Sequence, residues 1–133
     1  MIIEDYVSFE TAKLLKEKGF DEATYRAYIE TNKEHQLSFD VGRNNSQWEK
    51  INKEDGIFNC SAPTLQMAMK WLRKVHKIVI AISFQYDKFY QPYYFYKIAN
   101  IGKKEDWNIE KSEHITVEEA TEAAIKYCLE NLI

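Results

Sequence analysis

Two cysteines are the residues of this sequence whose side chains could act as nucleophiles. Cys60 precedes a predicted helix that begins near Pro63, and the positive end of a helix can lower the pKa of a nearby thiol. A reactive thiol would also need a base, which would have to be a histidine from elsewhere in the chain. We favour the alternative, a small half-buried side chain, and place Cys128 on the inner face of a predicted helix. A small hydrolase or thiol enzyme around Cys60 is therefore our third functional hypothesis.

The other ionisable residues show none of the spacings that bind a metal or a phosphate. There is no C-x-x-C or H-x-x-x-H pattern, and the glycines are isolated, so there is no phosphate-binding loop. Paired acids fall at predicted turns and helix starts, where acids are common. We expect no catalytic residue, no metal, no cofactor and no enzymatic activity. The histidines considered as metal ligands are His35, His76 and His114. The paired acids are Glu4 and Asp5, Asp21 and Glu22, Glu54 and Asp55, and Glu118 and Glu119.

Aromatic side chains crowd one predicted hairpin, between Phe84 and Tyr96. Successive residues of a strand point to opposite faces, so one sheet face cannot bury all of these rings. Exposed rings could stack on nucleic-acid bases or anchor a protein partner. The alternative is a sheet covered on both faces, by helices on one and by a long loop on the other. The candidate binding residues in this group are Tyr90, Tyr93, Tyr94 and Tyr96.

Basic residues form a second candidate surface, on the outer face of a predicted helix. Lys70, Arg73, Lys74 and Lys77 recur at helical spacing and could contact phosphates. The alternative is an ordinary solvated helix face. Together with the aromatic hairpin, this stripe carries our second hypothesis, a nucleic-acid-binding module.

The elements that position these residues are organised around the range 62–86, which predicts one helix running directly into one strand. Apolar residues recur at three- and four-residue steps from Leu65 to Val75, which indicates a helix over 63–77. At Ile78 the period changes to two and continues to Tyr86, with β-branched and aromatic residues at alternate positions. The aromatic hairpin and the basic stripe therefore flank the same strand.

The rest of the chain predicts two more helices and a series of strands. Ser8 as N-cap and Gly19 after the last turn frame a helix over 9–18, with Phe20 touching Leu15. Thr116 opens a capping box for a helix over 117–131. Alternating residues indicate strands at 25–29 and 37–41, joined by a loop of about five residues, and at 93–101 and from 107 onward. Their predicted core faces are Tyr25, Ala27 and Ile29, and Leu37, Phe39 and Val41.

The range 42–61 shows no clear period, although parts of it are apolar enough to pack, and a short strand near Ile57 is possible. The predicted order is α-β-β-α-β-β-β-α. We therefore expect an α+β fold with a single antiparallel sheet of about five strands and three helices, in one domain over residues 1–133.

Composition narrows the functional classes. The chain has 133 residues and a formal net charge of −3, which gives no general attraction to nucleic acid or to anionic membranes. No apolar run is long enough to span a bilayer, and the N-terminus is acidic where a signal peptide would be basic. We expect a cytoplasmic protein whose two cysteines remain thiols.

Three segments resemble a family of small uncharacterised proteins from bacterial phages, prophages and mobile elements. They are the ranges 7–20, 62–76 and 122–133. The resemblance implies a mobile-element origin, and it brings no catalytic residue, ligand or partner.

The order α-β-β-β-α from 62 to 133 is similar to that of double-stranded-RNA-binding domains. Those domains carry lysines where this chain has Glu118, Glu119 and Glu122, which would repel phosphate. Nucleic acid is therefore an unlikely partner. Our first hypothesis is a non-catalytic binding or interaction protein whose partner could be a host protein, with its oligomeric state left open.

Overall fold

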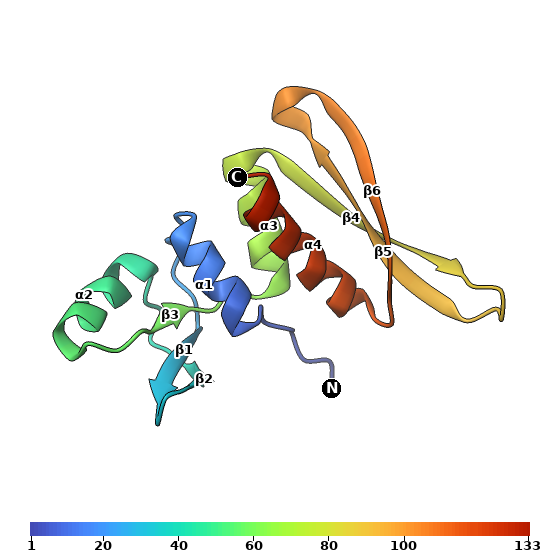
Figure 1. Ribbon diagram of the computed structural model, residues 1–133. Coiled ribbons are helices and arrows are strands. Elements are labelled where there is room, and N and C mark those ends of the chain that lie inside the picture. Colours follow the sequence, from blue (N-terminus) through green and yellow to red (C-terminus); the bar gives the residue numbers. More distant parts are fainter. The chain divides into compact units, whose positions relative to one another are not determined.

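The computed structural model describes the backbone of residues 1–133 and all side chains outside residues 109–112. The chain divides into two compact units, Met1–Thr64 and Leu65–Ile133, each with its own antiparallel sheet (Figure 1). The predicted α+β class is confirmed. The predicted single sheet and three helices are wrong, because the described backbone forms two three-stranded sheets and four α-helices.

Helix α1, Phe9–Glu17, is the first element of the N-terminal unit and confirms the predicted helix. The Ser8 hydroxyl accepts a hydrogen bond from the N–H of Thr11 at 3.3 Å. At the other end, Gly19 has a φ of +94° and the N–H of Phe20 donates to the carbonyl of Leu15 at 2.9 Å. This is the Schellman ending that the sequence predicted. It buries Leu15 and Phe20 in the core of this unit.

The first sheet has the order β2-β1-β3, with β1 over Arg26–Thr31, β2 over Glu34–Phe39 and β3 over Cys60–Ser61. The turn between β1 and β2 is only Asn32-Lys33, both with positive φ, instead of a loop of about five residues. The predicted short strand exists, but at β3 and not at Ile57.

The predicted inner faces of β1 and β2 are wrong at four of their six positions. The exposed fractions are 78% for Tyr25, 37% for Leu37, 80% for Phe39 and 82% for Val41, whereas Ala27 is fully buried. Tyr25 and Val41 lie outside the strands because the turn is shorter than expected. The guanidinium carbon of Arg26 lies 3.7 Å from the centre of the Phe39 ring, on one face of this otherwise exposed side chain.

Helix α2, Asn45–Asp55, occupies the range in which no element was predicted. Asn44 is its N-cap, and a reciprocal capping box joins Asn44 and Gln47. Gly56 ends the helix with a φ of +73°. Trp48 is buried, so α2 is held to its unit mainly by one large apolar side chain and by polar contacts described below.

The C-terminal unit begins with α3, Leu65–His76, and continues with β4, Ile78–Tyr86, and β5, Pro92–Asn100. A short 3-10 helix, η1 at Ile101–Lys103, leads to β6, Glu105–His114, and α4, Val117–Asn131, ends the chain. The strand order is β4-β5-β6. Both helices lie on the same face of this sheet (Figure 1). Their shared core includes Leu72, Ile78, Ile98, Ile125 and Leu129.

Three lysines adopt the left-handed backbone conformation at the ends of strands. Lys33 lies in the turn before β2, Lys77 lies between α3 and β4, and Lys104 lies just before β6, with φ of 66°, 59° and 55°. Glycine would be the least strained residue at each of these positions.

Candidate functional site

The turn between β4 and β5 is rigidly built. The Asp87 carboxylate accepts hydrogen bonds from the main-chain N–H groups of Phe89 and Gln91, at 2.8 and 3.0 Å. Its main-chain carbonyl also accepts from the N–H of Tyr90 at 3.0 Å. Figure 1 shows this hairpin projecting away from α3 and α4. Asp87 therefore holds the turn in one conformation at the end of the unit.

Two rings stand at the end of this turn, and we refer to them as the aromatic tip. Phe89 is 70% exposed and Tyr90 is 83% exposed. The ammonium of Lys88 lies 5.1 Å from the centre of the Phe89 ring. On β4, Phe84 and Tyr86 extend the apolar surface toward the body of the sheet, at 58% and 62% exposure.

The four candidate tyrosines do not form one surface. Tyr90 is exposed, while Tyr93 and Tyr94 are half-buried on opposite faces of β5. The Tyr93 hydroxyl donates to Oε1 of Gln85 at 2.7 Å. Tyr96 is only 5% exposed, and its ring centre lies 6.2 Å from that of Tyr127 on α4. Tyr96 is therefore a core residue that no ligand could reach in this conformation.

Lys70, Arg73 and Lys74 of the basic stripe are exposed on α3. Lys77, predicted on the same helix, is also exposed but lies one residue beyond its end, with a φ of +59°. Val75, predicted to face inward, is 56% exposed on the same helix. Lys77 directly precedes β4, whose nine residues separate it from the turn. At about 3.3 Å per residue, the strand places this end of the stripe roughly 30 Å from the aromatic tip. The stripe and the tip are therefore separate surfaces.

Cys60 lies on β3, five positions before the first residue of α3, and its side chain is fully buried. Burial raises its pKa to about 12. The thiol is protonated at neutral pH and lacks the thiolate character of a nucleophile. The expectation of a half-buried side chain is corrected to full burial. Burial also raises the pKa of Cys128 to about 12.

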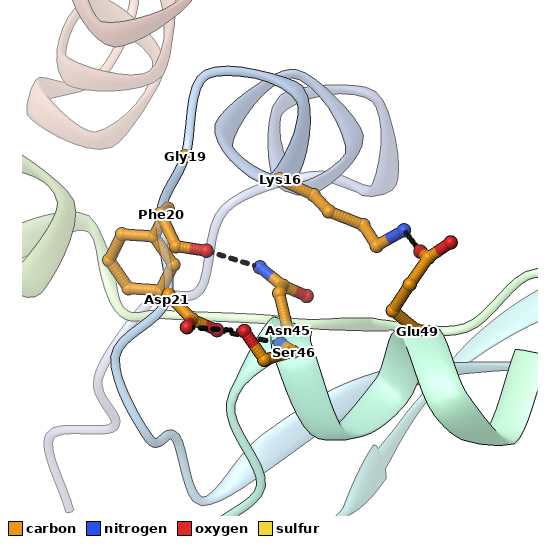
Figure 2. Close-up of a pocket in the computed structure, with 7 residues that line it drawn as sticks. All are labelled: Lys16, Gly19, Phe20, Asp21, Asn45, Ser46 and Glu49. Carbon is orange, nitrogen blue, oxygen red and sulfur yellow. Dashed lines mark hydrogen bonds and ion pairs between the residues drawn. The ribbon is translucent and has the colours of Figure 1, made fainter.

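Two hollows of the N-terminal unit, of about 280 Å³ and 370 Å³, lie between α1 and α2, and both are lined by Lys16 and Glu49. The Lys16 ammonium pairs with Glu49 at 2.5 Å, and this cation lowers the pKa of the Glu49 carboxyl (Figure 2). The Asp21 carboxylate accepts from both the N–H and the hydroxyl of Ser46. Lys16, Glu49 and Asp21 therefore have protein partners already.

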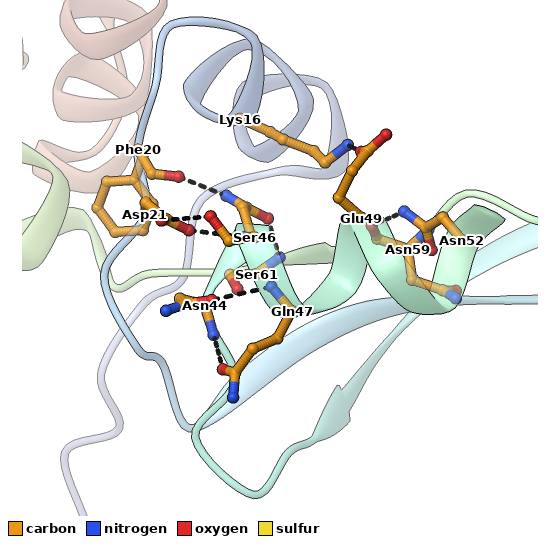
Figure 3. A network of polar contacts seen from close by, with 11 residues as sticks. Lys16, Phe20, Asp21, Asn44, Ser46, Gln47, Glu49, Asn52, Asn59 and Ser61 are labelled. Atoms are coloured by element: carbon orange, nitrogen blue, oxygen red, sulfur yellow. Dashed lines mark hydrogen bonds and ion pairs between the residues drawn. The ribbon is translucent and has the colours of Figure 1, made fainter. Parts of the chain in front are cut away.

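A network of amides joins α2 to its neighbours (Figure 3). Asn45 donates to the carbonyl of Phe20 at 2.7 Å and accepts from the N–H of Ser61 at 2.9 Å. Asn52 exchanges two hydrogen bonds with the main chain of Asn59. Because each of these side chains satisfies main-chain groups, we interpret the network as structural.

His35 is part of an aromatic cluster next to the same hollows. Its ring stacks on that of Phe9, with 3.8 Å between the ring centres, and Nε2 lies 3.1 Å from the carbonyl oxygen of Phe58. Lys16 lies above the Phe58 ring.

Among the side chains outside residues 109–112, no three His, Cys, Asp or Glu residues are grouped so that they could hold a metal ion. No helix of the described chain is long and apolar enough to cross a bilayer.

Comparison with protein-family models, with curated proteins and with solved structures finds no match for this chain. Its function must therefore be argued from its own surfaces. Sequence reasoning counted Phe89 among the aromatic residues of the hairpin, but of the two tip residues it named only Tyr90 as a candidate binding residue. The signal was present, because Asp87 two residues before Phe89 is typical of a side chain that fixes a turn.

Proposed function

We propose that the protein is a non-catalytic binding protein that engages a protein partner through the aromatic tip. The observation that carries this proposal is the exposure of Phe89 and Tyr90 on a turn fixed by Asp87. Exposed rings of this kind supply large contact areas, and a fixed turn lowers the entropy lost on binding. Aromatic anchors dominate the binding energy of many protein interfaces.

We further propose that the partner is a bacterial host protein and that the binding takes place in the cytoplasm. The resemblance of three segments to proteins of phages and mobile elements supports a host target. The two cysteines are free thiols, which suits a reducing compartment.

A nucleic-acid-binding module is the second candidate, because the basic stripe is exposed to solvent. Against this candidate, Glu118 and Glu119 are both exposed in the first turn of α4 and would repel phosphates. Lysines and arginine on α3 could neutralise about three or four phosphates, which gives weak and strongly salt-dependent binding.

Affinity capture from a bacterial lysate, with and without nuclease, tests the proposal. Phe89→Ser with Tyr90→Ser should reduce recovery of a specific partner by about tenfold or more, since loss of an anchor ring commonly costs over 1 kcal/mol. Tyr25→Ser is the matched control, because this ring is 78% exposed but lies on the N-terminal unit. Recovery should be unchanged by the control.

Two outcomes would contradict the proposal. One is a partner retained equally by the tip variant and the wild type. The other is capture that disappears with nuclease and with Arg73→Glu, which would favour the nucleic-acid module.

A further inference from the structure

Strand β4 forms one edge of the C-terminal sheet, since it pairs with β5 on one side only. In an edge strand, alternate residues direct their N–H and C=O groups away from the neighbouring strand. Within the described part of the chain, no hydrogen bond joins these outward main-chain groups of 78–86 to another residue. Within the C-terminal unit, the edge is therefore available to another strand.

The two edges of this sheet differ in how they are protected. Natural edge strands commonly carry charges, prolines or bulges that prevent pairing with another chain. The edge strand β6, EDWNIEKSEH, contains five charged residues with its histidine counted as neutral: three Glu, one Asp and one Lys. Its register with β5 shifts twice.

Strand β4, IVIAISFQY, contains no charge, no proline and no register shift over nine residues. Only β4 therefore has the properties of an edge that pairs.

We propose that β4 pairs with β4 of a second copy of this chain, joining two sheets into one continuous six-stranded sheet. A two-fold axis perpendicular to the sheet makes the two identical strands antiparallel. The midpoint of β4 is Ile82, so Ile82 faces its own equivalent. On the same face, Ile80 meets Phe84 and Ile78 meets Tyr86.

These cross-strand pairs are favourable in type. Aromatic residues opposite β-branched residues are among the stabilising pairs of antiparallel sheets. Phe84 and Tyr86 are 58% and 62% exposed on the single chain. Pairing in this register would give both rings an aliphatic neighbour from the second copy. Self-association of β4 is thus independent of the aromatic tip, whose rings lie in the turn beyond the strand.

The other face of the paired strands carries small or neutral residues. Ala81 meets Ser83 of the second copy, and Val79 meets Gln85. No like charges oppose one another anywhere along the nine positions. A strand that is neutral throughout and places aliphatic residues opposite aromatic ones fits a second copy of itself better than it fits a charged foreign strand.

The first experiment measures mass against concentration by analytical ultracentrifugation. The wild type should change from monomer to dimer as its concentration rises. A wild type that stays monomeric up to about 500 μM would overturn the proposal, because a specific dimer of even modest affinity is populated there.

A charge exchange tests the register. A variant with Ala81→Lys and Ser83→Lys places lysines opposite lysines, and a variant with Ala81→Glu and Ser83→Glu does the same with glutamates. Each alone should dissociate at least about tenfold more readily than the wild type, because like charges opposite one another oppose pairing. Mixed in equal amounts, the two variants should form a heterodimer. Asp106→Lys with Asn108→Lys on β6 is the control and should leave the dimer intact.

Cysteine cross-linking gives a second measurement, whose result does not depend on whether the charge variants fold. Ile82→Cys should form a disulfide-linked dimer under mild oxidation, because the two copies of residue 82 face each other. Val79→Cys should not, because its two copies would lie about 20 Å apart at 3.3 Å per residue. Equal cross-linking of both variants, or of neither, would overturn the proposed pairing.

Discussion

Asn52 and Asn59 are joined by a pair of hydrogen bonds. The side-chain amide of Asn52 bonds to the main chain of Asn59, as the main chain of a neighbouring strand would. Nδ2 of Asn52 donates to the main-chain carbonyl of Asn59 at 2.8 Å, and the main-chain N–H of Asn59 donates to Oδ1 of Asn52 at 3.0 Å. Asn59 itself is only 3% exposed, and its side chain accepts from the N–H of Glu30 on β1 at 2.8 Å. Through this pair, α2 is connected to the first sheet.

We expect Asn52→Leu to lower the free energy of unfolding by about 1–3 kcal/mol, because two main-chain groups of Asn59 lose their partners. Chemical denaturation of the purified protein measures the change. Lys50→Ala, at an exposed position of the same helix, should alter stability by no more than about 0.5 kcal/mol. Equal effects of the two substitutions would show that the amide pair does not hold α2.

Asn45 gives a prediction with a pH signature. Its Nδ2 donates to the carbonyl of Phe20, so Asn45→Asp places a buried carboxylate against an acceptor. A protonated carboxyl can donate where the carboxylate cannot, so burial should raise the pKa of the new group in the folded state. The variant should therefore be least stable at neutral pH and recover stability as the pH falls toward about 4. Asn45→Ala, which has no proton to gain, should show no recovery relative to wild type.

His76 should make folding weaker in acid. Its Nε2 is buried without a hydrogen-bond partner among the described residues, and its ring centre lies 4.9 Å from that of Trp71. Desolvation lowers its pKa below the ordinary value of 6.5. The unfolded state therefore binds the proton more readily, and stability falls as the pH drops below about 6.5. Thermal unfolding between about pH 7.5 and 5 should show a smaller loss for His76→Phe than for the wild type. An identical loss in both would contradict this role.

The two cysteines should be unreactive in the folded protein. Both thiols are fully buried, with their pKa values raised to about 12. A thiol reagent at neutral pH should label them far more slowly than free cysteine, and at the free rate after denaturation. Fast labelling of the folded protein would contradict the burial of both side chains.

Cys60→Ser should cost about 1–3 kcal/mol of stability, because a hydroxyl without a partner would be buried. Cys60→Ala should cost less stability than Cys60→Ser if the buried hydroxyl accounts for most of the loss. The comparison between the two variants, made by denaturant unfolding, separates polarity from lost volume.

Much of the fold could be predicted where the sequence shows both a period and its caps. For α1, Ser8 and Gly19 marked the two ends, and Phe20 identified the type of ending. For β4, the alternation from Ile78 to Tyr86 located the strand correctly. These features are local, because all the residues that form each one lie close together in the sequence.

Helix α2 was missed because its apolar period is weak. Trp48 and Ile51 are its only large apolar residues, so periodicity gave too little signal. The caps were nevertheless readable, since Asn44 and Gln47 have capping-box spacing and Gly56 follows the last turn. Capping signals deserve more weight than periodicity in a polar helix.

The partition into two sheets could not be predicted, because strand pairing depends on contacts far apart in the chain. Nothing in Cys60–Ser61 indicates that it pairs with β1, from which it is separated by all of α2. The exposure of the candidate site was equally inaccessible. Tyr90 and Tyr96 are similar in sequence context, yet one is 83% exposed and the other 5%.

The left-handed lysines at the strand ends have a consequence for the thermal stability of the protein. A lysine in that conformation is less stable than glycine by about 1 kcal/mol, and the chain accepts this at Lys33, Lys77 and Lys104. Glycine at each of these positions would remove the strained side chain, so an engineer seeking a more heat-resistant variant would begin at these three lysines.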